Sequence, residues 1–211
     1  MLAIPSPNIA CLVTSADIKS DRDARFLEYK AGIEAAAKFL PSLPIRILET
    51  RCFRNSNLEL LGSTYYSKTH IPNIKNKGVL WALALRKYVK NLPKQGLRPT
   101  HLVILTGRYE LKSSYFYEQM TTIGDFDFIG KRINSLNEVN TGLFCIKLDL
   151  LEQWLDNYSF IKSEIYSISV ELNLMSFLNS ASKLGKSIIF LEKLDLFMPV
   201  FGRGVRDFRL E

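Results

Sequence analysis

The sequence lacks the long apolar segment and the cysteine pattern that mark membrane-spanning or disulfide-rich proteins. No apolar run in its 211 residues reaches the roughly 18 residues that cross a bilayer. The opening stretch, Met1 to Pro5, has no basic region and no long apolar run, so we expect no signal peptide. The three cysteines are too few and too scattered for a disulfide framework or a zinc site. We expect a reducing, cytoplasmic setting.

The sequence also lacks any block of five or more like charges, although its net charge is +7. A positive balance suits nucleic acid, an anionic membrane surface or a phosphorylated small substrate. Because Lys and Arg are spread along the chain, we do not expect nucleic-acid binding, and most of the basic residues are expected to form a solvated surface. With 47% hydrophobic and 23% charged residues, the composition is that of a globular protein.

Apolar periodicity predicts alternating strands and helices. Short apolar runs predict strands at Ile9–Val13, Ile45–Leu48, His101–Leu105, Val139–Ile146 and Ser187–Leu191. Helical spacing predicts helices at Arg25–Leu40, Val79–Leu92, Leu150–Trp154 and Glu164–Ser180. The polar stretch Cys52–Ile74 is interpreted as a long excursion before the next helix. This alternation predicts a three-layer α/β sandwich with a mostly parallel central sheet, which we expect to be a single domain over residues 1–211.

The clearest candidate for an anion site follows the predicted strand His101–Leu105. The strand ends in Thr106, Gly107, Arg108 and Tyr109. Ligands of open α/β sheets sit beyond the carboxyl ends of the strands. A glycine lets the backbone come close to a ligand, and an arginine presents a planar fork of donors suited to phosphate. This turn therefore indicates a nucleotide-sugar site.

Polar residues also end the first two predicted strands. Thr14 and Ser15 follow the first strand, where they can hydrogen-bond a nucleotide or simply begin a turn. Glu49 ends the second strand, followed two residues later by Arg51. A carboxylate at that position suits a ribose hydroxyl or a base edge, and it can equally be an ordinary surface charge.

Two further stretches suit phosphate or sugar. Asn76, Lys77 and Gly78 precede a helix, whose free amino-terminal N–H groups attract anions, although Asn76 can also serve as an N-terminal cap only. Gly142 lies at the start of a predicted strand and could leave room for a sugar ring.

The tail carries the second strongest phosphate signal. Arg203 stands between Gly202 and Gly204, and Arg206 adds a second cation. The same residues can instead form a basic linker to a further domain.

Three carboxylates are candidates for metal binding or catalysis. Asp125 and Asp127 form an Asp-x-Asp pair, which can share a divalent cation bridging a diphosphate but also arises often by chance. They serve the Thr106 turn only if the fold brings them into the same crevice. Glu171 falls in the first turn of a helix if that helix starts at Ser167 or Ser169, where the helix dipole favours a carboxylate.

The order of these motifs resembles the GT-A glycosyltransferases. The matching features are Thr14-Ser15, Glu49, the helix opened by Asn76-Lys77-Gly78, and the strand ending Leu105-Thr106-Gly107-Arg108-Tyr109. The chain looks similar to viral and bacterial glycosyltransferases with a Thr-Gly-Arg-Tyr turn, among them the amino-terminal domain of a large multidomain glycosyltransferase of algal chloroviruses. The resemblance covers most of the chain, and the order of its short motifs carries more weight than any one of them.

The resemblance implies sugar transfer from a nucleoside-diphosphate donor, UDP-linked, to a glycan such as a viral capsid or surface glycan. Most GT-A enzymes carry Asp-x-Asp where this chain has Thr106-Gly107-Arg108, a departure that counts against the usual Mn²⁺ or Mg²⁺ site. It suggests that Arg108, Arg203 or Arg206 neutralises the diphosphate instead. Inverting GT-A enzymes tend to place a carboxylate base at the start of a later helix. Glu171 matches that order, with Glu164 and Asp127 as substitutes.

Two rival functions remain open on the sequence. A nucleotidyltransferase that makes the activated sugar usually has a glycine-rich basic loop after the first strand, but Thr14-Ser15-Ala16-Asp17 contains no glycine. A basic, non-enzymatic binding module would instead bind nucleic acid with a steep dependence on salt.

Overall fold

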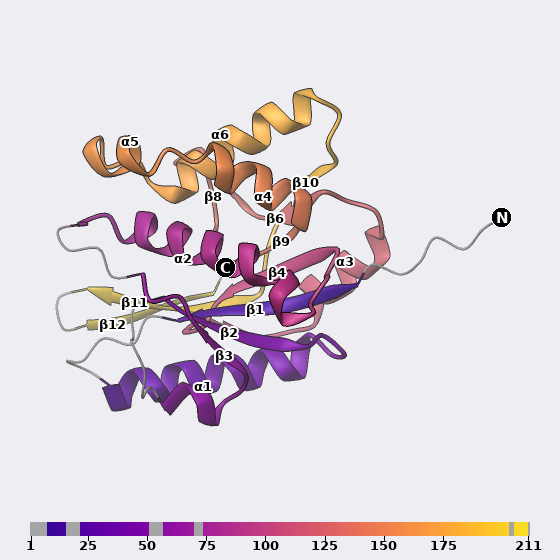
Figure 1. Ribbon diagram of the computed structural model, residues 1–211. Coiled ribbons are helices and arrows are strands. Elements are labelled where there is room, and N and C mark those ends of the chain that lie inside the picture. The colour runs from indigo at the N-terminus through magenta and orange to yellow at the C-terminus, as the bar shows by residue number, and fades with distance from the viewer. Residues whose placement is uncertain (1–7, 16–21, 51–56, 70–73, 203–204, 211) are drawn as a thin grey trace.

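The protein, seen here as a computed structural model, is described over residues 8–15, 22–50, 57–69, 74–202 and 205–210 (Figure 1). Its central strands are β1 (Ile9–Ser15), β2 (Ile45–Glu49), β3 (Thr64–Tyr66), β4 (His101–Thr106), β6 (Phe128–Gly130), β9 (Leu143–Lys147) and β10 (Ile188–Phe190). They form one sheet in the order β10-β6-β9-β4-β1-β2-β3. Of these strands, β9 runs antiparallel to both of its neighbours and the others share one direction, which confirms the mostly parallel sheet.

Helices cover both faces of the sheet, as Figure 1 shows. The larger helices are α1 (Arg22–Phe39), α2 (Lys77–Asn91), α3 (Tyr115–Ile123), α4 (Leu148–Asn157) and α6 (Val170–Lys183). Leu12 of β1 packs in a core with α2, α4 and α6, while its neighbours Cys11 and Val13 pack in a second core with α1 and α3. The three-layer prediction is therefore confirmed.

The strands that the sequence predicts best are those buried on both faces. Residues 101–105 of β4 are all buried, as are residues 11–15 of β1. A strand covered by helices on both sides must be apolar at nearly every position, which is the continuous run that the sequence shows. Within the described residues, no helix combines the length and apolar character needed to span a membrane.

Three predicted segments are interrupted in the structure. Part of Cys52–Ile74 forms a short 3-10 helix (η2, Asn57–Leu60) and the edge strand β3, which is too short to show a periodic signal. The predicted strand Val139–Ile146 divides into β8 (Glu138–Val139) and β9, because the Asn140 side chain accepts the Gly142 N–H in a turn. The predicted helix Glu164–Ser180 divides into α5 (Phe160–Ile165) and α6.

The break between α5 and α6 has a local cause. Ser167 has a left-handed backbone with a φ of 51°, and the Ser169 hydroxyl accepts the Leu172 N–H as the N-terminal cap of α6. Serine competes for backbone hydrogen bonds and favours such a start. Glu171 therefore lies in the first turn of α6, as expected if the helix begins after Ser169.

The remaining elements lie outside the main sheet. β5 (Glu110–Leu111), β11 (Leu196–Gly202) and β12 (Val205–Leu210) form a small antiparallel sheet, and β7 (Arg132–Ile133) pairs with β8. A second short 3-10 helix, η3 (Pro93–Gln95), follows α2. The tail, interpreted from sequence as a turn or a linker, is thus largely a hairpin whose first strand pairs with β5.

Two buried thiols give a direct test of the core. Burial raises the pKa of the Cys11 thiol to about 12, and burial also raises the pKa of Cys145. A raised pKa keeps both thiols protonated and unreactive near neutral pH. We expect iodoacetamide at about pH 8 to leave both unmodified in the native protein and to alkylate both in denaturant, as measured by peptide mass spectrometry. Native-state alkylation of either residue would contradict this core.

Candidate functional site

The carboxyl ends of three parallel strands meet at one edge of the sheet. Register places Thr14 of β1 beside Thr106 of β4, and Ser15 of β1 beside Glu49 of β2. We call the edge formed by Ser15, Glu49 and Thr106 the carboxyl rim. These three strand ends lie together because parallel neighbours with matched register end at the same edge.

A hydrogen-bond network ties β1 to β2 at this rim. The Ser15 hydroxyl donates to Oε2 of Glu49 at 2.7 Å, and Thr50 Oγ1 donates to the Ser15 carbonyl at 2.8 Å. Thr14 Oγ1 reaches the Leu105 carbonyl at 3.4 Å. Glu49 is fully buried and Thr14 and Ser15 are 4% exposed. These contacts hold the rim together, and nucleotide binding by these residues stays a prediction.

Gly107 is needed for packing against α1. A Cβ added at Gly107 would lie 2.7 Å from Cγ1 of Val13, and one added at Gly32 of α1 would lie 2.1 Å from the Gly107 carbonyl oxygen. The absence of a side chain at position 107 therefore serves close approach of the turn to helix and strand. Arg108 Nη1 lies 3.9 Å from Glu28 Oε2, so its guanidinium is close to α1.

A chain of threonines links β4 to Glu171. Thr106 Oγ1 donates to the Thr141 carbonyl at 3.3 Å, and Thr141 Oγ1 donates to Glu171 Oε1 at 2.8 Å. The backbone of Gly142 is also close to the Tyr109 ring, since an added Cβ would lie 2.8 Å from two ring carbons. Thr106, Tyr109, Gly142 and Glu171 are therefore brought together at the rim.

The amino end of α2 is occupied by side chains of the same chain. Asn76 caps the helix, accepting the Gly78 N–H at 3.0 Å and donating to the carbonyls of Ser163 and Ile168. The Glu164 carboxylate accepts the N–H groups of Lys75 at 2.8 Å and Asn76 at 3.0 Å. The capping role of Asn76 is confirmed, and an anion at this helix end would have to share the N–H groups with Glu164.

A cavity of about 390 Å³ opens between the starts of α2 and α6. Its wall includes Lys75, Asn76, Gly78, Glu164, Ser169 and Glu171. Glu164 already holds two N–H groups, whereas Glu171 is anchored through the Thr141 hydroxyl on one oxygen. Burial raises the pKa of the nearby Tyr158, and the negative charge of Glu171 adds to this rise. Of the two carboxylates, Glu171 is the better candidate for chemistry in the cavity.

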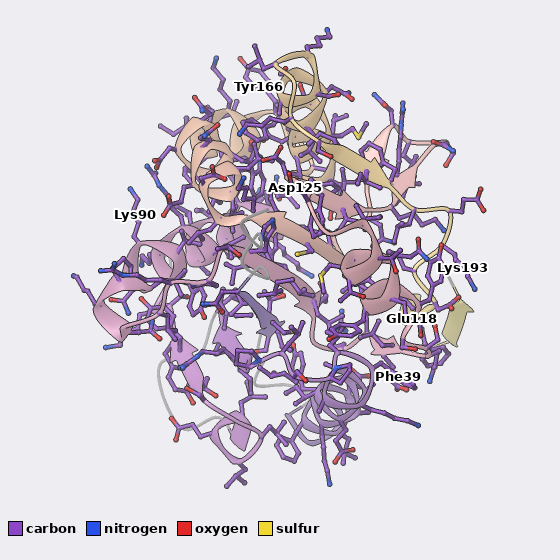
Figure 2. The ribbon with its side chains drawn as sticks, turned by 90° about the vertical axis from the view of Figure 1, so that its right-hand side faces the viewer. Phe39, Lys90, Glu118, Asp125, Tyr166 and Lys193 are labelled. Atoms are coloured by element: carbon purple, nitrogen blue, oxygen red, sulfur yellow. The ribbon has the colours of Figure 1, made fainter. Side chains whose placement is uncertain are left out.

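The Asp125–Asp127 pair lies at the opposite edge of the sheet. β6 runs parallel to β4, because both are antiparallel to β9, so the residues just before β6 lie away from the carboxyl rim. Asp125 faces the viewer in Figure 2, which looks from the side opposite to that rim. Asp127 contacts Lys147 and Lys186, each at 3.6 Å, and accepts the Ser187 N–H. The pair does not enter the Thr106 crevice, so the condition for a metal site shared with that turn is not met.

The described residues of the rim do not suit a divalent cation. The Thr106-Gly107-Arg108 turn has no carboxylate, and among the described residues no three His, Cys, Asp or Glu side chains gather to hold a metal ion. Hard divalent cations prefer several oxygen ligands, but Glu49 is fully buried and accepts the Ser15 hydroxyl, and Glu171 accepts the Thr141 hydroxyl.

The basic residues of the tail are only partly described. Arg203 of the tail lies outside the described residues, as does Arg51 after β2, and for Arg206 only its backbone position in β12 is described. The hairpin that carries Arg206 begins at the pairing of Leu196 with Leu111, shortly after the 106–109 turn. Their predicted role in phosphate binding stays a prediction.

Sequence reasoning missed Thr141 and the structural use of Glu164. Asn140-Thr141-Gly142 is a polar and small triplet inside an apolar run, and this interruption could have indicated a strand that starts at the rim. No local pattern indicates that Glu164 bonds residues nearly ninety positions earlier in the chain.

Comparison with known proteins identifies the fold. No protein-family model matches the sequence, and comparison with curated proteins finds no match. Among solved structures, a cytidylyltransferase from Leptospira borgpetersenii serovar Hardjo-bovis matches with a TM-score of 0.57 and 11% identity over 90% of this chain and 78% of that one. A candidate nucleotide-diphospho-sugar transferase from Desulfovibrio desulfuricans G20 matches with a TM-score of 0.53 and 8% identity, over 88% of this chain and 80% of that one.

A galactosyltransferase, LgtC, solved with donor and acceptor sugar analogs, matches with a TM-score of 0.50 and 11% identity over 86% of this chain and 72% of that one. At such low identity the likeness concerns the fold alone. The chain has the mixed α/β fold of GT-A nucleotide-sugar transferases, as the resemblance of its motifs implied.

The contact between Gly32 and Gly107 gives a test of how the turn is held. We expect Gly32→Ala to lower the free energy of unfolding by about 1–3 kcal/mol, because its Cβ would overlap the Gly107 carbonyl oxygen. Chemical denaturation measures this change. Ala37→Gly, at an exposed position of the same helix, calibrates the helix-propensity difference of about 1 kcal/mol. If Gly32→Ala instead stabilised the protein by that amount, the close contact would not exist.

Proposed function

We propose that the chain is a glycosyltransferase that moves a sugar from a UDP-sugar donor to a glycan acceptor. The observation that carries this proposal is the position of Glu171. Its carboxylate lines a cavity at the rim of a nucleotide-sugar-transferase fold and is held by a threonine that itself contacts the end of β4. Ligands of such sheets bind at this edge.

Glu171 is proposed as the general base of an inverting transfer. It would take the proton of the acceptor hydroxyl while that oxygen bonds to the anomeric carbon. The bond from the anomeric carbon to the phosphate oxygen breaks, and the nucleoside diphosphate leaves with the electron pair. Thr141 occupies one carboxylate oxygen, which orients the other for proton transfer.

The donor is proposed to lie along the carboxyl rim. Thr14, Ser15, Glu49 and Arg51 would face its nucleoside part, and the start of α2 at Asn76-Lys77-Gly78 would face its phosphates. Arg108, Arg203 and Arg206 would neutralise the diphosphate without a metal ion, since cations placed at the leaving group stabilise the developing charge. We further propose that residues 1–211 act as one domain. The resemblance to the chlorovirus glycosyltransferase domain supports a glycan acceptor of a viral surface.

A second candidate function is nucleotidyl transfer to a sugar. Its support is the match in fold to the Leptospira cytidylyltransferase. One fold hosts both reactions, so the ligands that bind must decide between them.

Ligand binding separates these functions. We expect a UDP-sugar near one hundred times its Kd to stabilise the native state by about 2.7 kcal/mol and to raise Tm by several degrees, with or without Mn²⁺. A thermal-shift series with UDP-, GDP- and dTDP-sugars, CTP and a short RNA measures this. A shift with CTP alone would favour the nucleotidyltransferase, and a shift with RNA alone would favour a basic binding module. A shift that appears only with Mn²⁺ would contradict the metal-free site.

The role of Glu171 is tested by comparing two carboxylates of one cavity. We expect Glu171→Gln to lower kcat roughly 100-fold or more with donor affinity retained, because only the proton acceptor is lost. Glu164→Gln should lower stability by about 1–3 kcal/mol through its two N–H contacts and leave kcat of the folded enzyme nearly unchanged.

Transfer assays and isothermal titration with donor measure these effects. Thr141→Val should lower kcat less than Glu171→Gln, and Thr141→Ser should restore it, since serine keeps the hydroxyl. Unimpaired transfer by Glu171→Gln, with activity abolished by Arg108→Ala or Glu164→Gln, would show that the base has been assigned to the wrong residue.

A further inference from the structure

Exposed apolar side chains are concentrated on α5 and at the start of α6. Of eight large hydrophobic residues that are exposed in the described chain, four lie between positions 161 and 172. Ile161 is 74% exposed, Ile165 67%, Tyr166 72% and Leu172 41%. Isolated exposed hydrophobic residues are common, but a cluster marks a surface that another molecule covers.

The cluster is held in a fixed position. Ile161 and Ile165 are one helical turn apart on α5 and share one side of it. α5 is fastened to the start of α2 by the contacts of Glu164 and Asn76. Figure 1 places α5 at a corner of the molecule, and Figure 2 shows Tyr166 near its outer edge. These side chains are therefore exposed on a helix that is itself packed against the rest of the protein.

Positive charge surrounds the cluster. Lys75, Lys77 and Lys162 are exposed, and none forms an ion pair with another residue in the described part of the chain. Asp156 is paired with Arg86 at 2.8 Å, whereas Glu164 and Glu171 accept hydrogen bonds from uncharged groups and keep their negative charges. The three lysines outnumber these two carboxylates, so this corner has a net positive charge.

We propose that this surface, the α5 patch (Ile161, Ile165, Tyr166, Lys75, Lys77 and Lys162), docks the protein on an anionic lipid bilayer. Isoleucines insert between headgroups, tyrosine favours the boundary between hydrocarbon and water, and each lysine near an anionic surface adds attraction. The exposed lysines beside these apolar side chains complement the negative headgroups of such a bilayer, which is why an anionic bilayer is proposed as the occupant.

Docking at the α5 patch would place the cavity at the membrane surface, because Glu164 of α5 lines that cavity. An acceptor carried by the bilayer could then reach Glu171. The docking itself does not depend on the proposed sugar transfer, and it is measured without any nucleotide sugar.

Vesicle sedimentation tests the docking. We expect the wild-type protein to bind vesicles of phosphatidylglycerol and phosphatidylcholine, to bind pure phosphatidylcholine weakly, and to dissociate as salt rises to about 0.5 M. The double variant Ile161→Ser and Ile165→Ser should lose roughly tenfold or more in partition coefficient. Lys162→Glu should lose several-fold on anionic vesicles only.

The matched control is the double variant Leu136→Ser and Leu184→Ser, which removes two leucines that are 61% and 84% exposed outside the patch. It should bind like the wild type, and thermal unfolding should show all variants folded, since the changed side chains are on the surface. The proposal would be overturned if the control variant lost as much vesicle binding as the Ile161→Ser, Ile165→Ser variant. It would also be overturned if the wild type did not bind, or if it bound neutral and anionic vesicles equally well. So would size-exclusion chromatography showing a wild-type dimer that the Ile161→Ser, Ile165→Ser variant abolishes, because the patch would then join two copies.

Discussion

The candidate site depends on the reversal of one strand. β9 enters the sheet antiparallel to β4, so its beginning lies where β1, β2 and β4 end. This reversal brings Thr141 to Thr106 and, through the Thr141 hydroxyl, to Glu171 on a helix thirty residues further on. If β9 were parallel, Thr141 would lie at the far edge, where Asp127 is found. The direction of this strand therefore decides which polar residues can act together.

A second constraint is the competition for backbone N–H groups at the helix starts. Asn76 and Ser169 cap α2 and α6, and Glu164 takes two further N–H groups beside α2. Unpaired N–H groups at helix ends need partners, and here side chains of the chain itself supply them. The two carboxylates of the cavity are therefore held differently: Glu164 accepts backbone N–H groups, and Glu171 accepts the Thr141 hydroxyl at one of its oxygens.

Fold and site carry different kinds of information about function. Solved proteins with this fold include a cytidylyltransferase and a galactosyltransferase, so the fold alone does not choose the reaction. The particular residues at the rim differ from the usual metal-binding pattern, since Thr106-Gly107-Arg108 contains no carboxylate. The charge of a bound diphosphate would then have to be met by basic side chains, which also suit the positive balance of the chain.

The sequence by itself determined the alternating elements, the layered fold and the strand ends that form the rim, because strands buried on both faces and helices with one apolar side leave strong periodic signals in the chain. It also indicated the cap at Asn76 and the place of Glu171 in a first helical turn, since capping acts over three or four residues. Only the tertiary structure decided that Asp125 and Asp127 lie at the edge opposite the carboxyl rim, that Gly107 packs on Gly32, and that Thr141 reaches Glu171. Those relations depend on strand direction and on contacts between distant residues, which no local pattern encodes.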